Sequence, residues 1–222
     1  MRLAFYDMDK TVTRRATWTR FLVHAARSRA RWRLALLPVA GLAGLGYLAG
    51  LLDRGGLKRT SQQLMLGRLL APDELAQIAA TFADREVADG VPEGALARIA
   101  ADRADGYRLV LATASHGYYA AEIARRLGFD AVVATRAKRD VQGHILSELD
   151  GDNCYGPAKL RMIEAWMAGE GIARGDAHIR AYSDHVSDAP LLEWADEAFA
   201  VNAHGPLAVL ARARGWPLLD WR

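Results

Sequence analysis

The chain has 222 residues, of which 51% are hydrophobic and 25% are charged, and both shares are ordinary for a globular protein. This length accommodates one domain with a large insertion, or a core with a small second domain, and it can bury a core without disulfides. The single cysteine, Cys154, excludes an internal disulfide and fits a reducing compartment. Because no apolar leader precedes the first polar motif, we expect a cytoplasmic protein.

The first predicted element is a short buried strand at Arg2–Tyr6, and Asp7-Met8-Asp9-Lys10-Thr11 follows it directly. Two carboxylates two residues apart, on a turn that leaves a strand, can converge on one site. One of them can attack phosphorus, while the other protonates the leaving group and later activates water. Alone, the motif is also typical of a solvated turn or of a metal-binding Asp-x-Asp site in a glycosyltransferase.

The segment from residue 12 to about residue 90 shows no strand pattern, which predicts a helical insertion after the first strand. Between Asp9 and Asp53 it contains no acidic residue. The basic residues of this stretch are Lys10, Arg14, Arg15, Arg20, Arg27, Arg29, Arg31 and Arg33. An apolar run, Leu34–Leu52, follows them, and Pro38 with several glycines argues against a transmembrane span.

This basic and apolar stretch allows two interpretations. One is a solvated helix face followed by a buried helical hairpin, and the other is contact with an anionic membrane surface or an anionic substrate. Trp18 and Trp32 fit packing within the insertion better than stacking on bases. Because basic and aromatic residues do not interleave, we expect no nucleic acid partner.

Beyond residue 90, short apolar runs alternate with helical stretches. The predicted strands are Tyr107–Ala112, Ala131–Ala134, His178–Ser183, Ala198–Val201 and Pro217–Leu219. The predicted helices are Pro92–Ala104, Tyr118–Leu127, Pro157–Met167, Ala189–Ala195 and Pro206–Arg214. This alternation predicts an α/β fold with a mostly parallel, doubly wound sheet, and Thr135–Asp152 is interpreted as a hairpin around Gly143.

Three further polar clusters follow predicted strands, where ligands bind in such sheets. Thr113-Ala114-Ser115 offers hydroxyl and backbone N–H groups to a phosphate, or an ordinary helix cap. Lys159 can neutralise a carboxylate and a phosphate oxygen, although most lysines are exposed surface charges. Asp184 and Asp188, four residues apart, offer the oxygen ligands that Mg²⁺ prefers, but an isolated pair of this kind is also typical of helix capping.

Taken together, the four clusters resemble the haloacid dehalogenase superfamily, in which Asp-x-Asp-x-Thr, a strand-terminal Thr or Ser, a Lys and Asp-x-x-x-Asp occur in this order. The segments Gly151–Lys159 and Phe199–Asn202 resemble its phosphoserine-phosphatase-like branch. The resemblance covers essentially the whole chain. It implies a Rossmann-like core at residues 1–12 and 91–222, with an inserted α-helical cap at residues 13–90.

The resemblance also implies a magnesium-dependent phosphomonoesterase that acts on a small phosphorylated substrate. Asp7 would form an aspartyl-phosphate, and Asp9 would act as acid and then as base. The implied Mg²⁺ ligands are the Asp7 carboxylate, the Asp9 backbone carbonyl, Asp184 and, nearby or through water, Asp188. The implied phosphate-binding residues are Met8, Thr11, Thr113, Ala114 and Lys159.

The substrate is less defined. Phosphoserine-hydrolysing relatives look as though they carry a glutamate shortly after the first motif, whereas Thr13–Thr17 contains no acid here. Arg14 and Arg15 are candidates for selecting an anionic substrate. Three alternatives stay open: a lipid-phosphate phosphatase at a membrane surface, a phosphotransferase with the same intermediate, and a non-catalytic binding protein.

Overall fold

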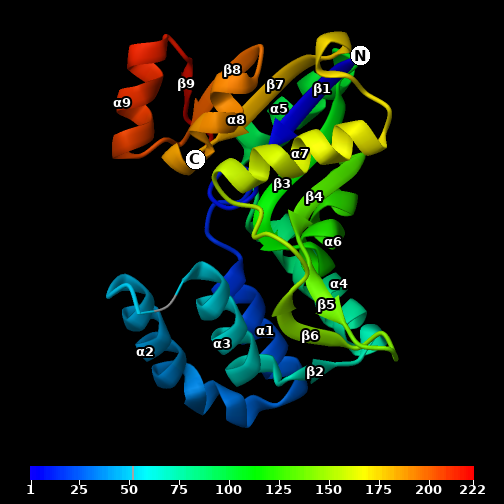
Figure 1. Cartoon of the computed structure of the whole chain (residues 1–222), viewed down its shortest axis with the longest axis vertical. Helices are drawn as coiled ribbons and strands as arrows, with labels where there is room; N and C mark the ends of the chain where they lie inside the picture. Colours follow the sequence, from blue (N-terminus) through cyan, green and yellow to red (C-terminus); the bar gives the residue numbers. More distant parts are fainter. Residues whose placement is uncertain (52) are drawn as a thin grey trace.

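A six-stranded parallel sheet forms the upper half of the computed structural model, which describes residues 1–51 and 53–222 (Figure 1). Its strand order is β4-β3-β1-β7-β8-β9, with every neighbouring pair parallel. The strands are β1 (Arg2–Tyr6), β3 (Arg108–His116), β4 (Ala131–Thr135), β7 (His178–Ser183), β8 (Glu197–Val201) and β9 (Leu218–Leu219). The predicted α/β fold class is confirmed.

Helices cover both faces of this sheet because its strands are apolar on both sides. Along β1, Ala4 and Tyr6 join one hydrophobic cluster, whereas Leu3 and Phe5 join the other, as expected when successive side chains alternate across a strand. The helices are α5 (Glu93–Ala104), α6 (Gly117–Leu127), α7 (Pro157–Gly169), α8 (Ala189–Trp194) and α9 (Gly205–Arg214). Short 3₁₀ turns, η2 (Arg174–Asp176) and η3 (Val186–Asp188), flank β7.

The insertion after β1 forms the lower half of the molecule in Figure 1. Its helical elements are α1 (Trp18–Arg29), the 3₁₀ helix η1 (Arg31–Leu36), α2 (Leu37–Leu48), α3 (Arg54–Leu66) and α4 (Pro72–Asp89). Leu52, the last residue of the predicted apolar run, lies outside the described residues. Because α4 packs along α6 as well as against α1, the proposed cap and core share one hydrophobic cluster.

A second, three-stranded sheet lies beside the insertion. The predicted hairpin is confirmed as the antiparallel pair β5 (Ala137–Arg139) and β6 (Ile145–Leu149). The prediction that the insertion lacks strands is wrong at β2 (Leu69–Leu70), which pairs antiparallel with β6. Two residues are too few to display the alternation by which a strand is found in a sequence.

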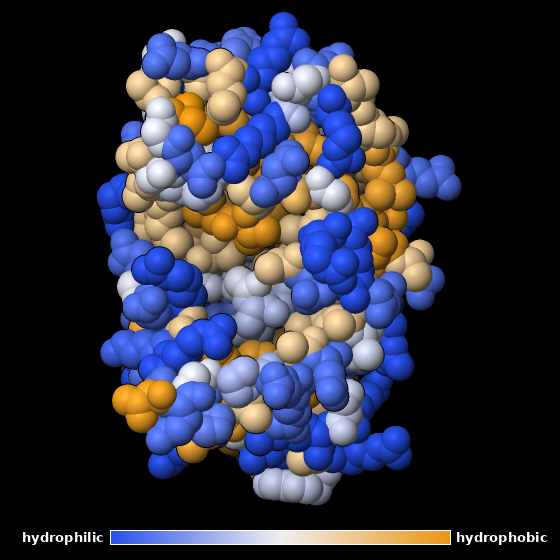
Figure 2. Space-filling model, turned by 90° about the vertical axis from the view of Figure 1, so that its right-hand side faces the viewer, coloured by the Kyte–Doolittle hydropathy of each residue, from blue (hydrophilic) through white to orange (hydrophobic). Residues whose placement is uncertain are grey.

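Figure 2 shows the face on the right-hand side of Figure 1, where hydrophilic side chains cover both halves and surround smaller hydrophobic patches. Such a mixture is normal for a protein surface. Within residues 1–51 and 53–222, no helix combines the length and the apolar character that a bilayer crossing requires.

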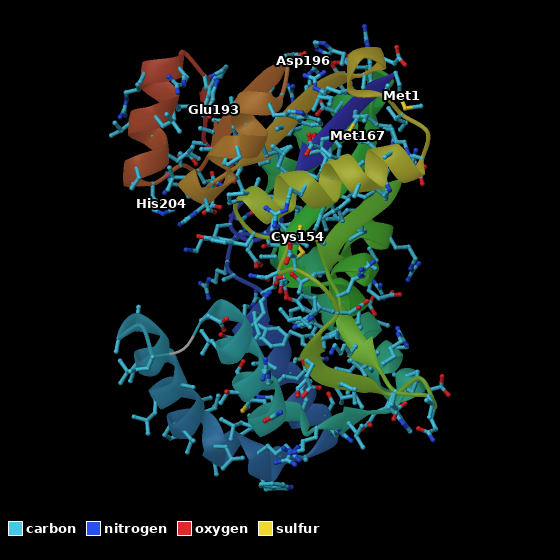
Figure 3. All side chains as sticks on the ribbon, in the orientation of Figure 1. Met1, Cys154, Met167, Glu193, Asp196 and His204 are labelled. Atoms are coloured by element: carbon cyan, nitrogen blue, oxygen red, sulfur yellow. The ribbon has the colours of Figure 1, made fainter. Side chains whose placement is uncertain are left out.

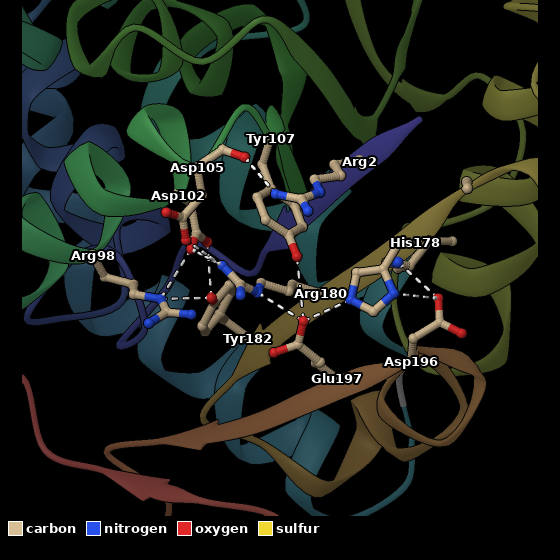
Figure 4. A network of polar contacts seen from close by, with 12 residues as sticks. Arg2, Arg98, Asp102, Asp105, Tyr107, His178, Arg180, Tyr182, Asp196 and Glu197 are labelled. Atoms are coloured by element: carbon tan, nitrogen blue, oxygen red, sulfur yellow. Dashed lines mark hydrogen bonds and ion pairs between the residues drawn. The ribbon is translucent and has the colours of Figure 1, made fainter.

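A buried polar network joins α5 to the middle of the sheet (Figure 4). The fully buried carboxylate of Asp102 accepts hydrogen bonds from the hydroxyls of Tyr6 (2.6 Å) and Tyr182 (2.8 Å). It also pairs with the guanidinium groups of Arg180 (2.8 Å) and Arg98 (3.2 Å). These contacts compensate the cost of removing the charge from water.

We therefore expect Asp102→Ala to lower the free energy of unfolding by about 3 kcal/mol, because it leaves buried donors without their shared acceptor. Urea unfolding measures the loss. The matched control is Asp105→Ala, which removes an exposed carboxylate 3.2 Å from the same Arg180 and should cost less than about 1 kcal/mol. Equal losses in the two variants would contradict this account of the network.

Candidate active site

The predicted site residues gather at the carboxyl ends of the central strands. Asp7 directly follows β1, Asp184 directly follows β7, and Thr113 lies near the end of β3; β1 pairs with both of the other strands. A cleft of about 270 Å³ opens there. Its lining residues are Asp7, Asp9, Lys10, Ala16, Thr113, Ala114, Tyr155, Lys159, Asp184, His185, Ser187 and Asp188.

Lys159 bridges two carboxylates at the bottom of this cleft. Its ammonium group lies 2.7 Å from Asp7 Oδ1 and 2.6 Å from Asp188 Oδ2, and the lysine is only 2% exposed. The Ser183 hydroxyl donates a further hydrogen bond of 2.7 Å to Asp188 Oδ2. Gly156, in the left-handed region with φ of 58°, turns the chain into α7 and so brings Lys159 to the cleft.

In the cleft, the positive charge of Lys159 does not fully balance the negative charge of the neighbouring carboxylates. Burial raises the pKa of Asp7, the Lys159 ammonium opposes this shift, and Asp188 and Asp184 add to it. Burial likewise raises the pKa of Asp184 to about 6. For Lys159, burial lowers the pKa, but the carboxylates of Asp188 and Asp7 outweigh burial and raise it above the usual value. A second cation in the cleft would therefore favour the ionised carboxylates.

The acidic residues fit a divalent cation of this kind. Asp188 Oδ1 is buried and has no hydrogen-bond partner among the described residues, which is costly for a carboxylate oxygen. In the described part of the chain, no three His, Cys, Asp or Glu side chains already converge as a metal site. The expected ligand set does not require this, because only the Asp7 and Asp184 side chains bind directly in it, together with the Asp9 backbone carbonyl, while Asp188 lies nearby or binds through water. Hard oxygen donors of this type suit Mg²⁺.

The Asp9 side chain points toward the insertion rather than toward Lys159. Its Oδ1 accepts hydrogen bonds from the backbone N–H (2.8 Å) and the hydroxyl (2.7 Å) of Thr17, and its Oδ2 accepts one of 2.9 Å from the Ser115 hydroxyl. Thr17 immediately precedes α1, so the first helix of the insertion orients this carboxylate. Thr17 is not predicted as a site residue from the sequence, where its only signal is that of a hydroxyl residue just before a helix.

The turn that carries the two aspartates is fixed by neighbouring threonines. The Met8 carbonyl accepts hydrogen bonds from the N–H (2.9 Å) and the hydroxyl (3.0 Å) of Thr13. The Thr11 hydroxyl lies 3.5 Å from Asp7 Oδ2. Met8 and Thr11 are fully buried, so the turn is held from within the fold.

The Thr113-Ala114-Ser115 cluster lies inside β3, where the pairing with β4 shifts register, and not after the strand as predicted. The Thr113 hydroxyl accepts a hydrogen bond of 3.0 Å from the Ser115 N–H. The Ala114 carbonyl accepts one from the ammonium group of Lys58, which also contacts Asn153 Oδ1. Lys58 belongs to α3, and no spacing in the sequence connects it with the cleft.

Arg14 and Arg15 are exposed, and neither lines the cleft. The residue of this segment that does line it is Ala16. The predicted site residues that line the cleft are Asp7, Asp9, Thr113, Ala114, Lys159, Asp184 and Asp188. Met8 and Thr11 are fully buried and Arg14 and Arg15 are exposed, and none of these four lines the cleft.

Cys154 lies where the two halves of the molecule meet (Figure 3). It is fully buried, and its backbone N–H donates to the Thr135 hydroxyl (3.0 Å). Burial raises the pKa of its thiol to about 12, so the thiol stays protonated near neutral pH. These features support a structural role for this cysteine.

A family model for haloacid dehalogenase-like hydrolases matches residues 4–193 of the chain. The chain belongs to this family. The expectation of an enzyme from its phosphatase branch is confirmed, and a purely non-catalytic role is therefore set aside.

Similar proteins extend over nearly the whole chain. The inhibition of morphological differentiation protein of Streptomyces azureus is 31% identical over 219 residues, which cover 98% of this chain and 78% of that protein. The phosphoserine phosphatase SerB1 of Mycobacterium tuberculosis is 29% identical over 226 residues, covering 99% and 70%. A solved structure of a protein of unknown function from Bordetella pertussis Tohama I superposes with a TM-score of 0.90 at 27% identity, covering 100% and 99%.

Proposed function

We propose that the protein is a magnesium-dependent phosphomonoesterase in which Asp7 is the nucleophile and Asp9 the general acid and base. The observation that supports this most directly is the different environment of the two carboxylates. Asp7 is buried beside Lys159, whereas Asp9 is held by Thr17 and Ser115. Carboxylates separated in this way can take different roles in one reaction.

In the first step, an Asp7 carboxylate oxygen forms a bond to phosphorus while the bond between phosphorus and the leaving oxygen breaks. Asp9 gives its proton to that oxygen. In the second step, water attacks phosphorus, Asp9 takes a proton from the water, and the bond between Asp7 and phosphorus breaks. Thr113, the backbone N–H groups near Met8 and Ala114, and Lys159 would bind the phosphoryl oxygens, with Thr11 supporting Asp7.

The residues that would hold Mg²⁺ are Asp7, Asp184 and the backbone carbonyl of Asp9, with Asp188 close by. When bound, the ion would neutralise charge on the phosphoryl oxygens and favour the ionised form of Asp7.

For the substrate we propose a small phosphorylated metabolite. Its leaving group would meet Lys10, Ala16, Tyr155 and His185, which line the cleft beside the catalytic residues. None of these four is an acid that could pair with the ammonium group of phosphoserine. SerB1 is named for phosphoserine, and we propose a different substrate preference here because the segment after the first motif contributes Ala16, and no acid, to the cleft lining.

The test is hydrolysis of an aryl phosphate by the purified protein. We expect turnover with Mg²⁺, a loss of roughly 10²-fold or more on chelation, and recovery when Mg²⁺ is added back, because a bound metal ion contributes several kcal/mol to such reactions. Release of inorganic phosphate, with and without added alcohols, separates hydrolysis from transfer to another acceptor. Full turnover in excess chelator would contradict the metal requirement.

A further inference from the structure

Helix α2 exposes large apolar side chains over the half of its surface that faces solvent. Its residues Val39, Leu42, Leu45 and Leu48, spaced three apart, are 46%, 64%, 60% and 78% exposed, and Leu51, just beyond the helix, is 80% exposed. These five residues are called the apolar row. Residues three apart are neighbours on a helix surface, but each step turns about 60° backward around the axis, so the row winds obliquely over the half of α2 that faces solvent.

The orientation of α2 is the reverse of what packing against a core would produce. The small residues Ala40 and Ala43 are half-buried, whereas the leucines of the row face solvent. Packing is mainly against α3 and η1, and Figure 1 places α2 at the outer edge of the lower half. Neighbouring exposed apolar side chains of this kind mark a surface that binds a protein partner, a ligand or a membrane.

The chain segment that leads into the apolar row is basic. η1 leads directly into α2, and at its start Arg31 and Trp32 are exposed, the latter by 64%. Arg27, also exposed, lies near the end of α1. No acidic residue occurs between Asp9 and Asp53, and Asp53 itself caps α3 by accepting a hydrogen bond from the Gly56 N–H.

Tryptophan at the edge of an apolar surface is typical of a membrane interface, where its ring sits at the level of the lipid headgroups. The expectation that Trp32 packs inside the insertion is therefore wrong. Its ring instead lies 4.9 Å from the Arg33 guanidinium, which also donates to the carbonyls of Gln63 and Leu64.

We propose that the apolar row, with Arg27, Arg31 and Trp32, is a docking surface for an anionic phospholipid bilayer. The leucines would enter the boundary between headgroups and acyl chains while the arginines contact anionic headgroups. The helix would lie in the interface, which agrees with its twelve-residue length.

Two other occupants fit less well. A symmetric dimer through this surface would bring the same basic residues of two copies together, and their repulsion would oppose it. An apolar peptide would need a groove, whereas the row stands on the outward side of a helix. An anionic bilayer satisfies both the convex shape and the charge.

The experiment is flotation of the full chain with vesicles of phosphatidylcholine, alone or mixed with phosphatidylserine, at low and high salt. We expect binding to the mixed vesicles at low salt and release at high salt. A Leu42→Ser, Leu45→Ser, Leu48→Ser variant should lose binding, and Arg27→Gln with Arg31→Gln should weaken it roughly tenfold or more. The matched control, Val141→Ser with Val209→Ser, changes exposed apolar residues elsewhere and should bind normally.

Aryl phosphate hydrolysis and thermal unfolding of each variant show whether the fold is intact. Vesicle binding is measured without substrate, so its failure is distinct from failure of the proposed phosphatase activity. Absence of wild-type binding to mixed vesicles at low salt would overturn the proposal. So would a wild-type dimer, seen by light scattering, that the leucine variant converts to a monomer without any effect on lipid binding.

Discussion

Replacing Asp7 by Asn is expected to lower kcat for an aryl phosphate by roughly 10⁴-fold or more, as loss of a covalent nucleophile does in other hydrolases. The amide is close to the carboxylate in size but lacks the negative charge and the nucleophilic oxygen. It also removes the charge partner that Lys159 holds at 2.7 Å. Steady-state release of the phenol, with saturating Mg²⁺, measures the effect.

Asp152→Asn is the matched control for this substitution. Asp152 is exposed and pairs with Arg161 at the surface, away from the cleft lining, so its variant should keep wild-type turnover. Thermal unfolding of both variants separates loss of chemistry from loss of fold. Turnover by Asp7→Asn within a few fold of wild type would remove Asp7 from the nucleophile role.

Replacing Asp9 by Asn is expected to lower steady-state kcat by roughly 10²- to 10⁴-fold, the usual contribution of a general acid or base. The step that suffers depends on the leaving group. An alkyl phosphate needs the proton of Asp9 to expel its alkoxide, so its first step slows. A phosphate of an acidic phenol needs little help in that step, and its second step slows because no base activates the water.

Rapid mixing distinguishes these two cases. For the aryl phosphate, Asp9→Asn should release about one equivalent of phenol per enzyme and then turn over slowly. For the alkyl phosphate, the same variant should show no burst. An equal loss for both substrates, without a burst for either, would mean that Asp9 orients the turn and does not transfer protons.

The strands of the sheet could be predicted from the sequence because their pattern is local. Arg2–Tyr6 and His178–Ser183 match β1 and β7 residue for residue, since each is a short run bounded by polar residues. β3 runs further than predicted, through Thr113 to His116, because the polar residues at its end resemble a turn. In a parallel sheet, the ends of adjacent strands meet, so the gathering of Asp7, Thr113 and Asp184 also follows from the sequence.

Contacts between residues that lie far apart in the sequence could not be predicted in this way. Lys58 reaches the Ala114 carbonyl from a helix in the insertion, 56 positions earlier, and Thr17 reaches Asp9 only because α1 starts next to the turn. The apolar run ending at Leu52 presented a different difficulty. A buried hairpin and an interfacial helix both need leucines, and the exposed fractions of Leu42 and Leu48 distinguish them only once the fold is known.

Trapping of the covalent intermediate tests the central claim most directly. The Asp9→Asn variant is incubated with a ³²P-labelled aryl phosphate and Mg²⁺, quenched in acid and digested. We expect label, sensitive to hydroxylamine, on the single peptide that contains Asp7, and no label in an Asp7→Asn, Asp9→Asn double variant. Hydrolysis without any covalent label, or label on another residue, would contradict the account.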